Sequence, residues 1–144
     1  MSVTDAAAEL EVGLAGEYSI VVTDEATADA YQNHGVRVLA TPHLVWMIEM
    51  AGNEAVAPVL PSTMASVGTR IDVRHLAPTP VGMHATARVR LIEKHGDRLV
   101  FDIDAWDDAG KIARGKHERH IVELDRFLDR VARKRPVRNR TSRD

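Results

Sequence analysis

The segment from Thr41 to Pro58, TPHLVWMIEMAGNEAVAP, decides the fold that we expect for this chain. Thr41 suits the N-cap of a helix, because its hydroxyl can accept a hydrogen bond from a first-turn amide. Pro42 suits the first helical position, where its missing N–H costs nothing, and Pro58 marks the far end. The residues between them are apolar on nearly every side, which predicts a buried helix.

Glu49 places a carboxylate in the middle of this apolar helix. A buried carboxylate needs an ionic or hydrogen-bonding partner, or it has to face a polar cleft. One interpretation is a structural ion pair with an arginine from a strand. The other is a general base or nucleophile in a cleft, and we take Glu49 as the first candidate functional residue.

Strand patterns lie on both sides of the helix. Residues 1–16 are expected to form a loose lead-in, followed by a strand over 17–23 and a short helix over 25–33. Alternating apolar residues after the helix predict strands over 65–76, 83–94, 98–106 and 111–124, joined by tight turns. Apolar residues at helical spacing over 124–131 follow. This order predicts an α+β protein, in which an antiparallel sheet wraps round one long helix and both bury their apolar faces.

Composition limits the class of protein. The 144 residues are 44% hydrophobic and 28% charged, which predicts a single globular domain over 1–136 and a basic, disordered tail over 137–144. The net charge of -2 gives no reason to expect nucleic-acid binding. Cysteine is absent, so no disulfide or thiolate site can form. No signal peptide or membrane span is visible, and we expect a cytoplasmic protein with no membrane partner.

Four segments, taken in order, resemble one known family over roughly residues 38–136. They are Thr41 with Glu49 eight residues later, SVGTRIDVRHLAPTPVG, EKHGDRLVFDIDAWD and GKHERHIVEL. Each segment alone is weak evidence, but their order and spacing are specific. The chain resembles the fluoroacetyl-CoA thioesterase-like branch of the hot-dog fold acyl-CoA thioesterases.

This resemblance implies a hot-dog fold and hydrolysis of an acyl-CoA thioester. By position in the motifs, it implies an active site made of Thr41, Glu49 and His75. It also implies that Gly68 lies near the thioester oxygen and that Arg119 takes part in substrate binding. The implied chemistry needs no cofactor, because CoA is part of the substrate, and we expect a homodimer, with a tetramer as the alternative.

The same residues can be interpreted on their own. His75 shares its parity with Ile71 and Val73, which places it on the inward face of its strand, toward the helix. It is either a core histidine or half of a Glu49–His75 pair that moves protons near neutral pH. Thr41 is most simply a cap, although a helix N-terminus also suits an oxyanion.

Three further positions leave alternatives open. Gly68 within a strand indicates either a bulge or the close approach of another group. Arg119 is either a phosphate or carboxylate contact or a plain surface charge. His117 and His120 point to opposite faces of their strand, so we expect no metal site there.

The chain departs from the fluoroacetyl-specific members in the segment before Thr41. Those members carry phenylalanines there as a lid, whereas AYQNHGVRVLA has Tyr31 and no phenylalanine. We therefore expect a more open pocket for an ordinary short or medium acyl-CoA, with Glu49 as base or nucleophile. Two alternatives remain, a hot-dog enoyl-thioester hydratase or dehydratase and a non-catalytic acyl-CoA binding module.

Overall fold

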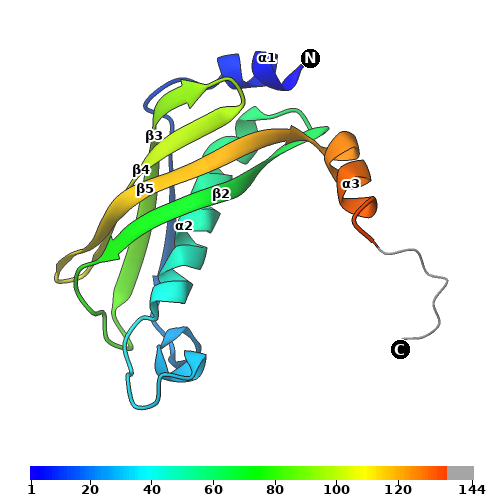
Figure 1. Ribbon diagram of the computed structural model, residues 1–144. Coiled ribbons are helices and arrows are strands. Elements are labelled where there is room, and N and C mark those ends of the chain that lie inside the picture. The colour runs from blue at the N-terminus through cyan, green and yellow to red at the C-terminus, as the bar shows by residue number, and fades with distance from the viewer. Residues whose placement is uncertain (136–144) are drawn as a thin grey trace, which may run out of the picture.

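A computed structural model describes residues 1–135, and the tail predicted over 137–144 lies outside them. One antiparallel sheet curls round one long helix, α2 (Thr41–Val56), as Figure 1 shows. The strands are β1 (Ala15–Val21), β2 (Met64–His75), β3 (His84–His95), β4 (Arg98–Asp107) and β5 (Gly110–Glu123). Their order in the sheet is β1-β3-β4-β5-β2, so β1 and β2 form its edges.

The core lies between α2 and the concave face of the sheet. α2 packs against β1, β2 and β3, and its buried side chains include Leu44, Met47, Ile48 and Val56. The opposing inward positions are Ala85, Ala87, Val89 and Leu91 on β3, with Leu99, Phe101, Ile103 and Ala105 on β4. The parity predicted for both strands is confirmed. Burying each large apolar side chain contributes about 1.5–3 kcal/mol to folding.

The outer face of the sheet carries charges instead of apolar side chains. Lys111 pairs with Asp104 at 2.6 Å and Lys116 pairs with Asp102 at 2.8 Å. Arg88 and Arg90 continue this face on β3, where both are exposed. Exposed ion pairs of this kind add little stability, but they mark a face that water covers.

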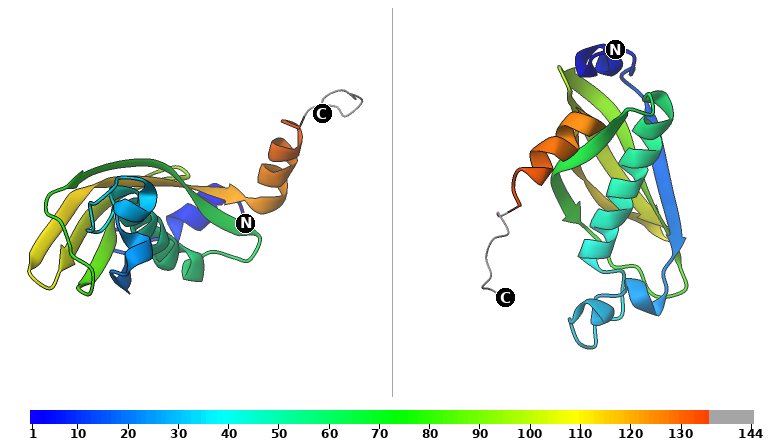
Figure 2. Two further views of the ribbon diagram at one scale, coloured as in Figure 1. Left: turned by 90° about the horizontal axis from the view of Figure 1, so that it is seen from below. Right: turned by 90° about the vertical axis from the view of Figure 1, so that its right-hand side faces the viewer.

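α2 is only partly buried, which corrects the prediction of a helix covered on all sides. The sheet covers one side of the helix and leaves a second side open, as Figure 2 shows. Trp46 is 41% exposed on that open side, where it packs edge to face on Tyr18. The side chain of Glu49 is 39% exposed. The carboxylate therefore sits at the boundary of the core, where solvent or a ligand can reach it.

The N-terminal prediction was wrong. The segment expected to be a loose lead-in contains a short helix, α1 (Val3–Ala8), with a reciprocal capping box between Ser2 and Asp5, and β1 already begins at Ala15. Lys94 on β3 donates hydrogen bonds to the carbonyls of Ala7 and Leu10, which fastens the end of this helix to the sheet. The sequence pattern missed it because its apolar residues are almost all alanine, which gives a weak periodic signal.

Three 3₁₀ turns complete the fold, with a final helix. The short helix expected over 25–33 is instead two separate turns, η1 (Asp24–Ala26) and η2 (Asp29–Tyr31). η3 (Ala57–Val59) follows α2, so the α-helix ends before Pro58. The helical spacing near the C-terminus is confirmed as α3 (Leu124–Ala132), which projects from the end of β5 (Figure 1). In the described part of the chain, no helix is long and apolar enough to cross a membrane.

Candidate active site

Thr41 does not cap α2, and its hydroxyl bonds to a histidine instead. The N-cap is Ala40, which has extended backbone angles, and Thr41 is the first residue of the helix, followed by Pro42. Thr41 Oγ1 lies 2.8 Å from Nδ1 of His75. The predicted capping role is therefore wrong, and capping no longer explains why a threonine stands here.

His75 closes β2 on the inward face, as its parity predicted, beside half-buried Ile71 and Val73. Burial lowers the pKa of His75 below its ordinary value of 6.5, because desolvation penalises the imidazolium form. The imidazole is thus neutral near pH 7. Its Nε2 is buried and finds no hydrogen-bond partner among residues 1–135. Since a buried polar atom of this kind is costly, it is a natural contact for a bound group or water.

A cavity of about 320 Å³ opens beside the Thr41–His75 pair. The rest of its lining is mostly apolar and comes from the segment before α2 and the turn after β2: Ala28, Asn33, Val36, Val38, Leu39, Leu76, Ala77 and Pro78. Tyr31 is not among the residues that line it, and its hydroxyl lies 3.0 Å from Nδ1 of His43 on α2. The segment that lacks phenylalanine thus forms one wall of a small pocket that has both polar and apolar lining.

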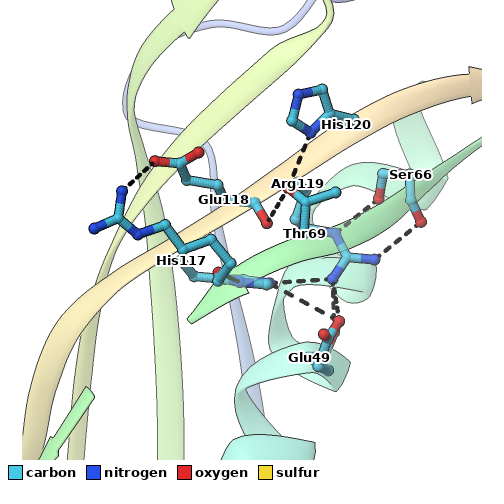
Figure 3. A network of polar contacts seen from close by, with 8 residues as sticks. Glu49, Ser66, Thr69, His117, Glu118, Arg119 and His120 are labelled. Atoms are coloured by element: carbon cyan, nitrogen blue, oxygen red, sulfur yellow. Dashed lines mark hydrogen bonds and ion pairs between the residues drawn. The ribbon is translucent and has the colours of Figure 1, made fainter. Parts of the chain in front are cut away.

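Glu49 pairs with Arg119 of β5. Arg119 Nη1 donates to Glu49 Oε1 at 2.7 Å, and Figure 3 shows the carboxylate of α2 meeting the guanidinium below the strand. Arg119 is only 3% exposed, so its interpretation as a plain surface charge was wrong. Its carboxylate partner is Glu49 of the same chain, which is the structural ion pair offered as one interpretation of Glu49, and its role in substrate binding stays a prediction. No hydrogen bond from residues 1–135 reaches Oε2 of Glu49. Oε1 is thus held by Arg119, whereas Oε2 has no hydrogen-bond partner in this part of the chain.

Gly68 makes room for this carboxylate. A Cβ atom at Gly68 would overlap both carboxylate oxygens of Glu49. The β2–β5 register also shifts between Gly68 and Arg70, with Thr69 as the extra residue. Both alternatives for Gly68, the close approach and the bulge, are therefore present together. The place of Gly68 beside Glu49 follows from the register, which sets it opposite Arg119, and its predicted place near the thioester oxygen stays a prediction.

The histidine beside Glu49 is His117, not His75. Nε2 of His117 lies 4.0 Å from Glu49 Oε1, whereas His75 forms its hydrogen bond with Thr41. The Glu49–His75 pair that we predicted is therefore not formed within the described part of one chain. His117 is fully buried. The sequence did contain a signal for this position. His117 and Arg119 are two residues apart on one strand, so their side chains lie on the same face, and if Arg119 faces the helix then His117 does as well.

His117 and His120 point to opposite faces, as predicted. His117 faces α2, while Nδ1 of His120 lies 2.9 Å from Thr69 Oγ1. Within residues 1–135, no group of three or more histidine, aspartate or glutamate side chains is arranged to hold a metal ion. The HERH run is thus a strand with one inward and one outward histidine.

A curled antiparallel sheet around a single long helix, with polar side chains set along the helix, defines a hot-dog fold protein. The family model described as fluoroacetyl-CoA-specific thioesterase matches residues 22–125. The chain is 37% identical over 100 residues to the fluoroacetyl-CoA thioesterase of Streptantibioticus cattleyicolor, an alignment that covers 69% of this chain and 72% of that protein. The chain belongs to the fluoroacetyl-CoA-specific thioesterase family, and with it to the acyl-CoA thioesterases.

Solved structures agree with this family and this fold. A mutant of the fluoroacetyl-CoA-specific thioesterase FlK superposes with a TM-score of 0.80 at 32% identity, over 88% of this chain and 98% of that one. A second FlK mutant, in complex with acetyl-CoA, gives 0.81 at 32% identity, over 88% and 100%. A hot-dog-like protein from Thermanaerovibrio acidaminovorans gives 0.84 at 25% identity, over 96% and 100%.

Proposed function

We propose that this protein hydrolyses a short or medium acyl-CoA thioester to the free acid and CoA. The observation that carries the proposal is the state of Glu49, whose Oε1 is anchored by Arg119 while Oε2 stays unbonded within residues 1–135. The cavity of about 320 Å³ beside Thr41 and His75 offers room for an acyl chain of this size.

The proposed reaction begins with attack on the thioester carbonyl, either by water or by Glu49. Glu49 accepts the water proton as a general base, or it attacks the carbonyl itself to give a mixed anhydride that water then hydrolyses. The C–S bond breaks, and the proton taken from water is passed by Glu49 through His75 to the CoA thiolate, so that Glu49 is again a carboxylate and His75 is again neutral. The Thr41 hydroxyl and the Gly68 N–H are proposed to hold the carbonyl oxygen or the water. Each proposed step is assigned to water or to a group of the protein, so the proposal uses neither a metal nor a redox cofactor.

We also propose that the active unit is a homodimer. Thr41 and Glu49 are eight residues apart on α2, which is about 12 Å along the helix axis. That separation is too wide for one thioester carbonyl to touch Glu49 and the Thr41–His75 pair of the same chain. β2 is an edge strand, and a two-fold axis beside it would bring Glu49 of one chain toward His75 of another.

Thiol release from a panel of acyl-CoAs tests the activity. Glu49→Ala and His75→Ala are compared with wild type, and Glu54→Ala, at an exposed position of the same helix, is the matched control. Release that disappears in the first two variants and persists in Glu54→Ala supports the proposal. Equal release in wild type and Glu49→Ala contradicts it. Hydration of an enoyl-CoA without free thiol would identify the hydratase, and binding without turnover would identify a binding module.

Mixing the two inactive variants tests the shared site. If each site combines Glu49 of one chain with His75 of its partner, a dimer of Glu49→Ala and His75→Ala chains keeps one intact site. Random exchange then restores about a quarter of the wild-type rate, as two-fold symmetry requires. No recovery in dimers shown to have exchanged would contradict a site shared between chains. The cytoplasmic location remains part of the proposal, and cell fractionation tests it.

A further inference from the structure

We propose that His117 is a positioning residue, which holds the Arg119 guanidinium in the orientation that aims Glu49 into the site. The inference rests on the proposed function, and it gives a role to a fully buried histidine that the proposed mechanism does not use. His117 contacts no reacting atom in this proposal. It acts through Arg119.

The hydrogen bonds of His117 decide its protonation state. Nδ1 lies 2.9 Å from the carbonyl oxygen of Arg70, which can only accept, so Nδ1 carries the proton. Nε2 lies 3.2 Å from Nη1 of Arg119, which can only donate, so Nε2 presents its lone pair. Burial and the Arg119 charge lower the pKa of His117, which agrees with a neutral ring. His117 is therefore a fixed acceptor aimed at the guanidinium.

The guanidinium has an acceptor for each of its three nitrogens. Nε donates to Ser66 Oγ at 2.8 Å and Nη2 donates to the Ser66 carbonyl at 3.0 Å. Nη1 is shared between Glu49 Oε1 at 2.7 Å, the Glu49 carbonyl at 3.4 Å and His117 Nε2. Figure 3 shows these contacts converging on one planar group. Ser66 accepts the hydrogen bonds of Nε and Nη2. His117 accepts one from Nη1, the nitrogen that also contacts Glu49.

The helix is brought close to this network at Gly52. A Cβ atom there would lie 2.9 Å from Cδ of Arg119 and 3.2 Å from Nε2 of His117. The absence of a side chain at Gly52 thus lets α2 approach both β5 residues at once. With Gly68 on β2, the chain has a glycine on each side of the Glu49–Arg119 pair, and both are sites where any side chain would crowd it.

Two substitutions separate the contacts of His117. The amide nitrogen of His117→Asn can replace Nδ1 as donor to Arg70, but the side chain is too short to reach Arg119. The amide oxygen of His117→Gln can replace Nε2 as acceptor from Arg119. We expect His117→Asn to lower kcat about tenfold to a hundredfold with KM little changed, because misplacing a reacting group costs that much. We expect His117→Gln to keep most of the wild-type kcat.

The control is His120→Asn, on the outward face of the same strand, which should leave kcat unchanged. Adding His117→Asn to Glu49→Ala should produce no further loss, since His117 acts through the Glu49 carboxylate. Equal losses in His117→Asn and His117→Gln, each matched by the loss of folded protein, would overturn the proposal in favour of a purely structural role. So would a wild-type kcat in folded His117→Asn.

A readout independent of turnover separates this proposal from the thioesterase itself. In ¹H–¹⁵N spectra, the Arg119 guanidinium of wild type should show slowly exchanging Nη protons, assigned by their loss in Arg119→Lys. We expect these signals to persist in His117→Gln and to average in His117→Asn. If wild type hydrolyses no acyl-CoA, the proposed function fails and these spectra still test the positioning. Unchanged signals in both variants would overturn it, as would an unchanged spectrum in Gly52→Ala, which crowds the same group.

Discussion

Oε1 of Glu49 accepts a hydrogen bond from Nη1 of Arg119 at 2.7 Å, across the boundary between the core and the open side of α2. The arginine is buried, whereas the carboxylate is 39% exposed. The pair is therefore both a structural ion pair and a way of presenting one carboxylate oxygen outward. The structural interpretation of Glu49, an ion pair with a strand arginine, is therefore confirmed, and its catalytic role remains a proposal.

Replacing the carboxylate by an amide should affect activity more than folding. Glu49→Gln keeps the volume and one acceptor, but it loses the negative charge, and we expect kcat to fall by about 100-fold or more. Arg119 keeps an amide acceptor, so unfolding in urea should show a loss of about 1–3 kcal/mol. The double variant Glu49→Gln/Arg119→Met should recover stability without activity. Recovery of activity in that double variant would contradict a role for the charge.

Removal of the Thr41 hydroxyl should leave stability almost unchanged. Thr41→Val keeps the shape of the side chain, and Ala40 remains the N-cap, so the loss of about 1 kcal/mol typical of a removed cap is not expected. Turnover should fall, because His75 loses its partner and the carbonyl loses a donor. Thr41→Ser should keep most of the activity. Melting temperature and thiol release, measured on the same samples, distinguish these effects. A melting temperature that falls with activity would show that the Thr41–His75 hydrogen bond serves the fold and would contradict a purely functional role.

A single methyl group at Gly68 should displace the Glu49 carboxylate. The added Cβ of Gly68→Ala overlaps both carboxylate oxygens, so Glu49 has to rotate away or the strand has to shift. We expect a fall in kcat of at least about tenfold. Thr69→Ala, at the adjacent bulge, removes a contact with His120 on the outward face and serves as the control. Equal activities of the two variants would contradict the proposed closeness of Gly68 to the reacting groups.

Acid should destabilise the fold through its buried histidines. Burial lowers the pKa of His43, His75 and His117 below 6.5, whereas the unfolded chain binds these protons near pH 6.5. The unfolded state therefore binds more protons below that pH, and stability is highest above it and falls with decreasing pH. Melting temperature should decline from pH 7 to pH 5. His117→Gln should decline less steeply, and a flat wild-type profile would contradict these shifts.

Metal removal should leave turnover unchanged. The proposed hydrolysis uses water, Glu49 and the Thr41–His75 pair, and it assigns no step to a metal ion. After dialysis against a chelator, the rate of thiol release should stay within about twofold of the untreated enzyme. A larger loss that a divalent cation reverses would show that the proposed mechanism lacks a component.

The sequence by itself determined the architecture and the kinds of residue at the site. Alternation with a period of two gave the inward faces of β3 and β4, because successive side chains of a strand point to opposite sides. The same rule gave the inward position of His75 and the opposite directions of His117 and His120. Local geometry is enough for these inferences, since each depends on a few neighbouring residues. That Glu49 needs an ionic partner or a polar cleft could also be inferred locally, because its neighbours along the helix are apolar.

Only the tertiary structure decided which partner each of these groups has. The candidate partners of Glu49 were His75, His117 and Arg119. The pairing of β2 with β5 sets Gly68 opposite Arg119, and this register brings Arg119 and His117 to Glu49. His75 lies at the other end of β2, and its hydrogen-bond partner is Thr41. Whether Thr41 caps its helix depended on the backbone angles of Ala40, which the packing of the preceding segment sets. Strand order and register join residues far apart in the chain, and no local pattern specifies them.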